Sequence, residues 1–208
     1  MMQLYGPVFS NNVFRPLLVA RHLKLPVEVK AVDLLQGEHK GDEYRALNPH
    51  ARIPVLVDGD YKLWESSAIM TYLAEQKPSP LYPTDVRARA TIASWMFWGR
   101  SHLMRAVGTI QFERMVKKMF GRGEADETLV APAIESFDAE MAVMEDRLKD
   151  RHSSDWLVGD GITIADYDIA GALMYADEVA LPMAQYPRST AWLARVKAQP
   201  AWAESLKG

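Results

Sequence analysis

A short proline-rich segment separates two stretches of different pattern. Residues 77–85 read KPSPLYPTD, with three prolines in nine residues, which is typical of a stiff linker between domains. Short apolar runs and turn residues precede it, whereas helical patterns with few prolines follow it. The sequence therefore predicts a first domain over residues 1–78, a linker over 79–86 and an all-helical domain over 87–208.

The start of the first domain has the pattern of a βαβ unit. Gln3–Tyr5 predicts a short strand, ended by Gly6-Pro7, and Val27–Val32 predicts a second strand. Between them, the polar cluster SNN begins an apolar periodic segment that runs to about Leu23. Two strands joined by a helix are expected to pair in parallel.

The later part of this domain predicts a hairpin and a capped helix. Residues 36–52 are polar and hold a short helix at most. The apolar runs Val55–Val57 and Tyr61–Trp64 flank Asp58-Gly59, a strong hairpin signal. Glu65-Ser66-Ser67 then supplies N-cap residues for a helix that ends near Gln76. The complete order is β-α-β-α-β-β-α, which indicates a four-stranded mixed sheet with helices on both faces.

Long helical patterns fill the second domain. Val86–Gly121 is one such segment, and Glu127–Arg151 is another with apolar residues at nearly helical spacing. Thr163 and Asp166 have the spacing of a capping box in which Asp replaces Glu. The apolar segment after them predicts a buried central helix, and Ser189–Ala198 predicts a last helix.

Charge and cysteine content narrow the classes of function. A net charge of −3 gives no reason to expect a nucleic acid or an anionic membrane as a partner. No stretch reaches the roughly 18 apolar residues of a membrane span, and the N-terminus lacks a signal-peptide pattern. The chain has no cysteine, so any thiol chemistry must come from a ligand. We therefore expect a cytoplasmic enzyme or binding protein.

The segment from Asn48 to Ile69 offers groups that suit a small zwitterionic peptide. It provides backbone beside Pro54, a carboxylate at Glu65 and a helix N-terminus with hydroxyl groups. Backbone can pair with an extended peptide, a carboxylate can bind an ammonium group, and a helix N-terminus favours a carboxylate. The residues alone predict this binding without naming the peptide.

The sequence resembles the cytosolic glutathione transferase superfamily over its full length. The stretch GEHKGDEYRALNPHARIPVLVDGDYKLWESSAI is similar to theta, phi and related bacterial members of the serine type, and GDGITIADYDIA and YPRSTAWLARVKAQPAW are similar to C-terminal signatures of the superfamily. The resemblance implies a thioredoxin-like α+β first domain, an all-α second domain, glutathione as cosubstrate, no metal and a homodimer.

The resemblance also implies roles for polar residues at the start of the first helix. Ser10 matches the serine that activates the glutathione thiol, and Asn12 matches an asparagine that some bacterial members place two residues later. Arg15 lies where many members have a basic residue. From the residues alone, the alternative is that this polar cluster only caps the helix. We expect Ser10 to be catalytic, with Asn12 as the second candidate.

Seven residues match positions that bind glutathione in the superfamily. Glu65 and Ser66 match the pair that binds the γ-glutamyl group. Ile53 and Pro54 match the cis-proline step, where the backbone pairs with the cysteinyl part. The remaining candidates are cations for the glycine carboxylate, for which a solvated basic surface is the alternative: His39, Lys40 and Arg52.

The electrophile pocket of the superfamily lies between the first-domain loop and the long helix, which makes six residues candidates by position: Phe9, Asn11, Trp98, His102, Arg105 and Met115. For Trp98 and Met115 the alternative is an ordinary core stripe. No acidic residue occurs over residues 86–111, although several members use one there to contact the glutathione of the neighbouring subunit.

The predicted function is conjugation of the glutathione thiolate to small hydrophobic electrophiles, as in detoxification. A glutathione-dependent peroxidase, dehalogenase or isomerase uses the same chemistry and stays open. Isomerases of the zeta type have a Ser-Ser-Cys run where this chain has SNNV, which argues against that branch. An interaction protein without enzymatic activity is the alternative from another class, but such relatives tend to lose the serine and the Glu-Ser pair.

Overall fold

The computed structural model describes residues 1–149 and 155–207, and the chain forms two compact units. The first comprises Met1–Pro83 together with Lys197–Gly208, and the second comprises Thr84–Val196. The break between residues 83 and 84 falls within the proline-rich segment. Residues 197–208, which the sequence pattern places in the second domain, group with the first unit instead.

The first unit is built on a four-stranded mixed sheet with the strand order β2-β1-β3-β4. The strands are β1 (Met2–Tyr5), β2 (Val27–Lys30), β3 (Val55–Asp58) and β4 (Tyr61–Trp64). β1 pairs in parallel with β2, with Leu4 opposite Val29, and antiparallel with β3, with Leu4 opposite Leu56. The predicted hairpin joins β3 and β4, and Gly59 in its turn has φ 63°. The predicted thioredoxin-like fold class is confirmed.

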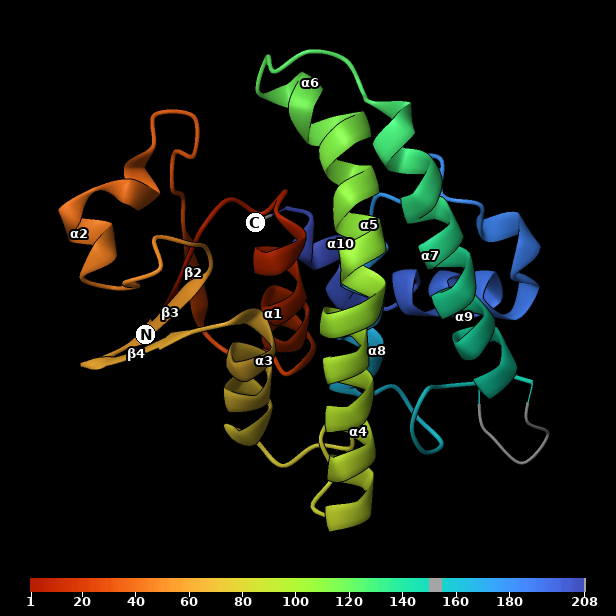
Figure 1. Ribbon diagram of the computed structural model, residues 1–208. Coiled ribbons are helices and arrows are strands. Elements are labelled where there is room, and N and C mark those ends of the chain that lie inside the picture. Colours follow the sequence, from red (N-terminus) through yellow and green to blue (C-terminus); the bar gives the residue numbers. More distant parts are fainter. Residues whose placement is uncertain (150–154, 208) are drawn as a thin grey trace. The chain divides into compact units, whose positions relative to one another are not determined.

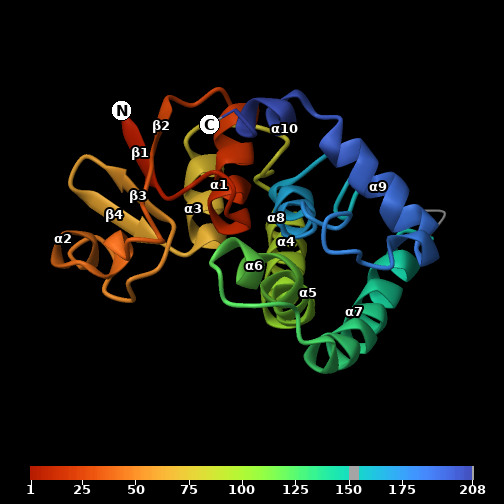
Figure 2. The same ribbon diagram turned by 90° about the horizontal axis from the view of Figure 1, so that it is seen from above.

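Helices cover both faces of this sheet (Figures 1 and 2). Helices α1 (Asn11–His22) and α3 (Ser66–Glu75) contact each other on one face. The short elements η1 (Glu38–Lys40) and α2 (Asp42–Arg45) lie on the other face, where Tyr44 packs in a buried cluster. Alternate strand residues point to opposite faces, so this short sheet supports two separate apolar clusters.

The last helix of the chain, α10 (Pro200–Ser205), packs against α1 within the first unit (Figure 2). The ring of Trp202 meets the ring of Phe14 edge to face, with centroids 4.9 Å apart. Such an aromatic pair adds about 1 kcal/mol beyond its buried area. The C-terminal residues therefore stabilise α1, the helix whose N-cap is Ser10.

A nearly continuous helical column opens the second unit (Figure 1). It contains α4 (Val86–Trp98), the π-helical turn η2 (Gly99–Leu103), α5 (Met104–Gln111), a second π-helical turn η3 (Phe112–Val116) and α6 (Lys117–Met119). Helix α7 (Glu127–Arg147) runs beside α5. The predicted end of this helix at Arg151 lies outside the described residues.

The centre of the second unit is α8 (Ile164–Ala172), in which every residue is buried. Its predicted capping box is present: Asp166 Oδ2 accepts hydrogen bonds from the Thr163 backbone N–H at 2.8 Å and hydroxyl at 2.9 Å. The turn η4 (Met183–Gln185) and α9 (Pro187–Lys197) follow. Across residues 1–149 and 155–207, no helix combines the length and the apolar character needed to cross a membrane.

Candidate functional site

The serine at the start of α1 occupies the N-cap but does not use its side chain as a cap. Ser10 has extended backbone angles, φ −76° and ψ 123°, and its carbonyl accepts bonds from Val13 and Phe14, both at 2.9 Å. Its hydroxyl makes no capping bond and no hydrogen bond to any other residue that the structure describes. Capping therefore does not occupy the Ser10 side chain, and its hydroxyl is available to a ligand.

A buried arginine holds the first turn of α1 together. Arg15 is completely buried. Its Nε donates to the Asn11 carbonyl at 3.1 Å, and its Nη2 donates to Asn12 Oδ1 at 2.5 Å. Residues three and four positions apart share one face of a helix, so one guanidinium reaches both asparagines. This contact fixes the turn that carries both candidate catalytic residues.

The loop before β3 is anchored by two side chains. The Arg52 carbonyl accepts hydrogen bonds from the Tyr44 hydroxyl at 3.1 Å and from Asn48 Nδ2 at 2.7 Å. The Ile53–Pro54 peptide bond is cis. The N–H and C=O of Ile53 have no hydrogen-bond partner within the described chain, although the loop around them is fixed. A ligand backbone could therefore pair with Ile53.

Gly6 brings this loop close to the start of α1. Its φ of +140° is one that side chains rarely adopt, and a Cβ atom there would lie 2.5 Å from Val13 Cγ2 and 3.3 Å from Ile53 Cβ. Only glycine fits such an approach without displacing its neighbours. Gly6 thus allows the segment around Ser10 and the loop at Ile53 to lie together in the first unit.

The start of α3 is a strained backbone position followed by a buried hydroxyl. Glu65 has φ 72° and ψ 117°, a conformation that costs a residue other than glycine about 1–3 kcal/mol and is most often found at functional sites. Its side chain is exposed. Ser66 is 5% exposed, and its hydroxyl has no hydrogen-bond partner among the described residues. The first N–H groups of the helix add donors that favour an anion.

The three predicted cations all lie in the first unit, on η1 and beside the cis-proline loop. The Nδ1 atom of His39 is buried without a hydrogen-bond partner, and burial, together with the charge of Lys40, lowers the pKa of this imidazole. Lys40 and Arg52 are exposed, and their charged groups make no hydrogen bond or ion pair with the described residues. The charged groups of Lys40 and Arg52 are therefore available to an anionic ligand, whereas the lowered pKa of His39 favours its neutral form.

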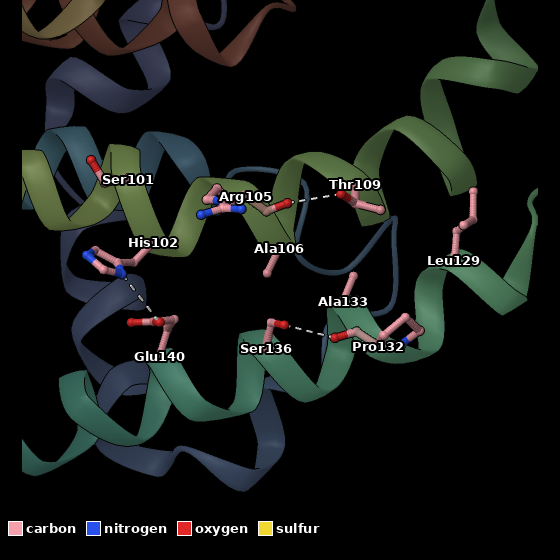
Figure 3. A pocket seen from close by; sticks show the side chains of 10 residues that line it. All are labelled: Ser101, His102, Arg105, Ala106, Thr109, Leu129, Pro132, Ala133, Ser136 and Glu140. Carbon is pink, nitrogen blue, oxygen red and sulfur yellow. Dashed lines mark hydrogen bonds and ion pairs between the residues drawn. The ribbon is translucent and has the colours of Figure 1, made fainter.

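A cavity of about 540 Å³ lies within the second unit, between α7 and the segment of η2 and α5 (Figure 3). The segment side contributes Ser101, His102, Arg105, Ala106 and Thr109, and α7 contributes Leu129, Pro132, Ala133, Ser136 and Glu140. The cavity brings together two of the predicted electrophile residues, His102 and Arg105. The other four, Phe9, Asn11, Trp98 and Met115, are not among its lining residues.

Glu140 organises one end of this cavity. Its Oε2 accepts a hydrogen bond from Trp98 Nε1 at 2.8 Å, and its Oε1 lies 3.8 Å from His102 Nδ1. The guanidinium of Arg105 has no hydrogen bond or ion pair with the described residues, which leaves it available to a ligand. Glu140 and the rest of the α7 wall were not predicted from the sequence, because periodicity along one helix does not identify the helix that packs against it.

Within residues 1–149 and 155–207, no three or more His, Cys, Asp or Glu side chains cluster in a way that could hold a metal ion.

Two family models match the chain. The N-terminal domain of glutathione S-transferases matches residues 1–75, and the C-terminal domain matches residues 95–200. A glutathione S-transferase of Hyoscyamus muticus is 32% identical, over 99% of this chain and 98% of that protein. Glutathione S-transferase theta-1 of Mus musculus is also 32% identical, over 95% of this chain and 82% of that protein.

Solved structures show the same likeness. Glutathione transferase F7 from Populus trichocarpa has a TM-score of 0.89 and 26% identity, with 100% of this chain and 98% of that chain covered. A glutathione S-transferase-I bound with the ligand lactoylglutathione has a TM-score of 0.88 and 28% identity, with 98% and 97% covered. The theta and phi-like resemblance seen in the sequence agrees with these relatives.

Proposed function

This chain belongs to the glutathione S-transferase family, and we propose that it conjugates the thiol of glutathione to small hydrophobic electrophiles. The single observation that carries the proposal is the Ser10 hydroxyl, which lies at the N-terminus of α1 without capping it. A serine that served only the helix would accept a bond from its first turn. An available hydroxyl at the positive end of a helix suits an anionic sulfur.

The first unit offers a partner for each charged end of glutathione. In the proposed complex, Glu65 binds the γ-glutamyl ammonium group, and Ser66 with the first N–H groups of α3 binds its carboxylate. The backbone of Ile53, beside Pro54, pairs with the cysteinyl residue. The glycine carboxylate lies near the cations His39, Lys40 and Arg52. Support comes from the unoccupied hydrogen-bonding groups of Ser66 and Ile53 described above.

Ser10 has to favour the thiolate form of glutathione. A free thiol has a pKa near 8.5, so only a few per cent is ionised at neutral pH. Lowering this pKa by about two units requires about 2.7 kcal/mol of preferential interaction with the anion. A hydrogen bond from Ser10 to the anion and the N-terminus of α1 would each supply about 1–2 kcal/mol. Asn12 is the second proposed donor.

In the proposed reaction the thiol proton leaves to solvent and the thiolate attacks an electron-poor carbon of the cosubstrate. With an aryl chloride, a C–S bond forms, the C–Cl bond breaks, and chloride leaves with the bonding electron pair. Ser10 donates a hydrogen bond to the sulfur throughout and is not itself modified. Glutathione is therefore consumed as a cosubstrate, and the chemistry proposed here calls on no metal.

The cavity in the second unit is the proposed electrophile pocket. Its volume of about 540 Å³ is in the range of pockets that bind small organic molecules. His102 and Arg105 offer polar contacts beside the apolar Ala106 and Ala133. The remaining predicted contacts, which come from the sequence resemblance alone, stay part of the proposal: Phe9, Asn11, Trp98 and Met115.

Retention on glutathione-agarose, followed by turnover of chlorodinitrobenzene, tests this function. We expect the protein to be retained, to elute with free glutathione and to release chloride as the conjugate forms. Retention without conjugation, but with reduction of a hydroperoxide, would favour the peroxidase alternative. Neither retention nor turnover would overturn the proposal and leave an interaction protein.

We also propose a two-fold homodimer, a cytoplasmic location and a role in detoxification. All three follow from the family resemblance. Light scattering tests the oligomeric state, and a mass near 23.4 kDa, that of a single chain, would contradict the dimer.

A further inference from the structure

Arg105 places an unpaired positive charge in the cavity of the second unit. It lines the cavity between α7 and the segment of η2 and α5 (Figure 3), and its guanidinium makes no hydrogen bond or ion pair with any described residue. Of the described residues that line this cavity, Arg105 alone carries a permanent positive charge. A guanidinium in this state can bind an anion through two parallel hydrogen bonds.

The sequence around Arg105 provides no carboxylate on the same wall of the cavity. On a helix, an acidic residue three or four positions away would pair with an arginine. No acidic residue occurs anywhere over residues 86–111, although this stretch contains four arginines. The wall formed by η2 and α5 is therefore positively charged.

The opposite wall supplies one carboxylate, which is engaged at another part of the cavity. Glu140 Oε2 accepts a hydrogen bond from Trp98 Nε1 at 2.8 Å, and its Oε1 lies 3.8 Å from His102 Nδ1. Figure 3 shows Glu140 and His102 at one end of the cavity and Leu129 at the other, with Arg105 between them. No ion pair joins Glu140 to Arg105, so the carboxylate does not neutralise the guanidinium.

Two hydroxyl groups that line the cavity already donate their protons to backbone. Thr109 Oγ1 donates to the Arg105 carbonyl and Ser136 Oγ donates to the Pro132 carbonyl, both at 3.0 Å (Figure 3). A hydroxyl has a single proton, so neither group competes with Arg105 for an anion. The guanidinium offers five N–H donors in a planar fork that matches the two oxygens of a carboxylate.

Apolar residues provide room for a ring beside Arg105. Ala106, Leu129, Pro132 and Ala133 line the cavity (Figure 3), and its volume of about 540 Å³ suits a small organic molecule. We propose that the cavity selects aromatic electrophiles that carry a carboxylate or a similar anionic group, and that Arg105 binds this group. The anionic group stays on the ring, while the carbon that bears chloride reacts as described above.

This inference rests on the proposed function, because it concerns the cosubstrate of the same reaction. The test compares chlorodinitrobenzoate with chlorodinitrobenzamide of the same substitution pattern, which have the same leaving group and nearly the same shape but differ in charge. For each variant we measure the ratio of kcat/KM for the acid to kcat/KM for the amide. Changes in glutathione binding or thiol activation cancel in this ratio, since both substrates depend on them equally.

Arg105→Met removes the cation but keeps a long side chain, and Arg105→Lys keeps the charge without the planar fork. We expect Arg105→Met to lower the acid-to-amide ratio about tenfold, as for the loss of one charge-assisted hydrogen bond. Arg105→Lys should retain part of the preference. Added salt should lower the ratio in the wild type and leave it unchanged in Arg105→Met, because salt screens the attraction between the two charges.

Arg87→Met is the matched control, because it removes the same charge from an exposed position of α4 outside the cavity. Its ratio should stay within about twofold of wild type. Ser136→Asp is a second variant, which adds a carboxylate to the opposite wall and should also lower the ratio.

Three results would overturn the proposal. The first is an unchanged ratio in Arg105→Met or in Ser136→Asp. The second is an equal fall in Arg87→Met and Arg105→Met, which would mean that net charge acts at long range. The third would show that a second copy of the chain places a carboxylate against Arg105: Arg105→Met would then weaken the proposed homodimer in light scattering and lower kcat/KM for the acid and the amide alike.

The two levels of the hypothesis fail in different ways. If the wild-type protein does not conjugate chlorodinitrobenzene, the proposed function fails and this inference fails with it. If the wild type conjugates chlorodinitrobenzene and the acid-to-amide ratio is indifferent to Arg105, only the inference fails.

Discussion

The helix N-termini of the two units use similar residues in opposite ways. In the second unit, Asp85 Oδ1 accepts from the Ala88 N–H at 2.8 Å at the start of α4, and Asp126 Oδ1 accepts from the Thr128 N–H at 3.0 Å at the start of α7. In the first unit, the N-cap residues of α1 and α3 make no side-chain capping bond. The N-cap side chains of α4 and α7 therefore bond the first turns of their own helices, whereas those of α1 and α3 remain available to a ligand.

Whether an N-cap side chain bonds its own helix distinguishes a structural role from a binding role, and the sequence alone does not make this distinction. A side-chain cap is worth about 1 kcal/mol, so α1 and α3 forgo this stabilisation at residues the family resemblance assigns to glutathione. A polar residue at a helix start is compatible with both roles. What distinguishes them is whether its side chain already bonds the first turn. We therefore expect substitutions of the helix-capping side chains in the second unit to change stability, and substitutions at the starts of α1 and α3 to change activity.

The largest effect is expected at Asp166. This carboxylate is completely buried and accepts four hydrogen bonds, from the Leu157 N–H, the Thr163 N–H and hydroxyl, and Trp192 Nε1, at 2.8–3.0 Å. Asp166→Ala leaves these donors buried without an acceptor, and each such loss costs about 1–3 kcal/mol. We expect the free energy of unfolding, measured by urea denaturation, to fall by about 4 kcal/mol.

Trp192→Phe is the matched variant for this prediction, because it removes only one of the four donors to Asp166 and keeps most of the apolar ring. We expect it to cost about 1–2 kcal/mol. If Asp166→Ala lost conjugating activity while keeping wild-type stability, the structural role assigned to this carboxylate in the second unit would be contradicted.

Ser10→Ala is expected to have the next largest effect, on rate. Removing a donor that stabilises a developing anion typically lowers the rate about 100-fold or more. We expect kcat/KM with chlorodinitrobenzene to fall about 100-fold, which corresponds to about 2.7 kcal/mol. Since the hydroxyl makes no capping bond, the free energy of unfolding should change by less than about 0.5 kcal/mol.

An exposed hydroxyl elsewhere provides the control for Ser10. Thr91 Oγ1 donates to the Arg87 carbonyl within α4, and Thr91→Ala should leave kcat/KM unchanged. If Ser10→Ala instead lowers stability by about 1 kcal/mol, the usual value of a cap, and leaves the rate intact, then Ser10 is structural. In that event Asn12 becomes the leading candidate for the thiol donor.

Local patterns predicted much of the molecule correctly. The βαβ start, the hairpin at Asp58-Gly59, and the capping box of Thr163 and Asp166 each lie within a few consecutive residues, so propensity and turn chemistry determine them. The positions of Ser10 and the Glu65-Ser66 pair were likewise readable from the sequence motif. Their roles in binding and catalysis remain predictions.

Contacts between distant segments were not predictable in the same way. The packing of Trp202 on Phe14 joins the two ends of the chain, and Glu140 meets Trp98 from another helix. Tertiary packing decides such pairs, and periodicity along one helix gives only the face that is buried. The strained backbone of Glu65 was also not predictable, since positive φ is favoured by glycine and, less strongly, by Asn, Asp and His, but not by glutamate.

Glu145 gives the last and smallest prediction, at the start of α9. Its carboxylate comes from α7, and it accepts hydrogen bonds from the Arg188 N–H at 3.0 Å, the Ser189 N–H at 2.9 Å and the Ser189 hydroxyl at 2.8 Å. Burial by itself would raise the pKa of Glu145, but these bonds and the charge of Arg188 outweigh it and lower the pKa. A second-unit helix is thus capped by a carboxylate from a neighbouring helix.

A lowered pKa in the folded state contributes stability above the unfolded pKa of about 4.3, and this contribution is lost as pH falls through the folded value. We expect Glu145→Gln to lower the free energy of unfolding by about 1–2 kcal/mol at neutral pH, and the difference from wild type to shrink below about pH 4.3. Urea denaturation across the acid range measures it. Glu135→Gln, at an exposed carboxylate of the same helix, should show neither effect. If the difference between Glu145→Gln and wild type stays constant down to low pH, the Glu145 side chain acts through packing and not through its charge. Its carboxylate would then not be an electrostatic cap for α9.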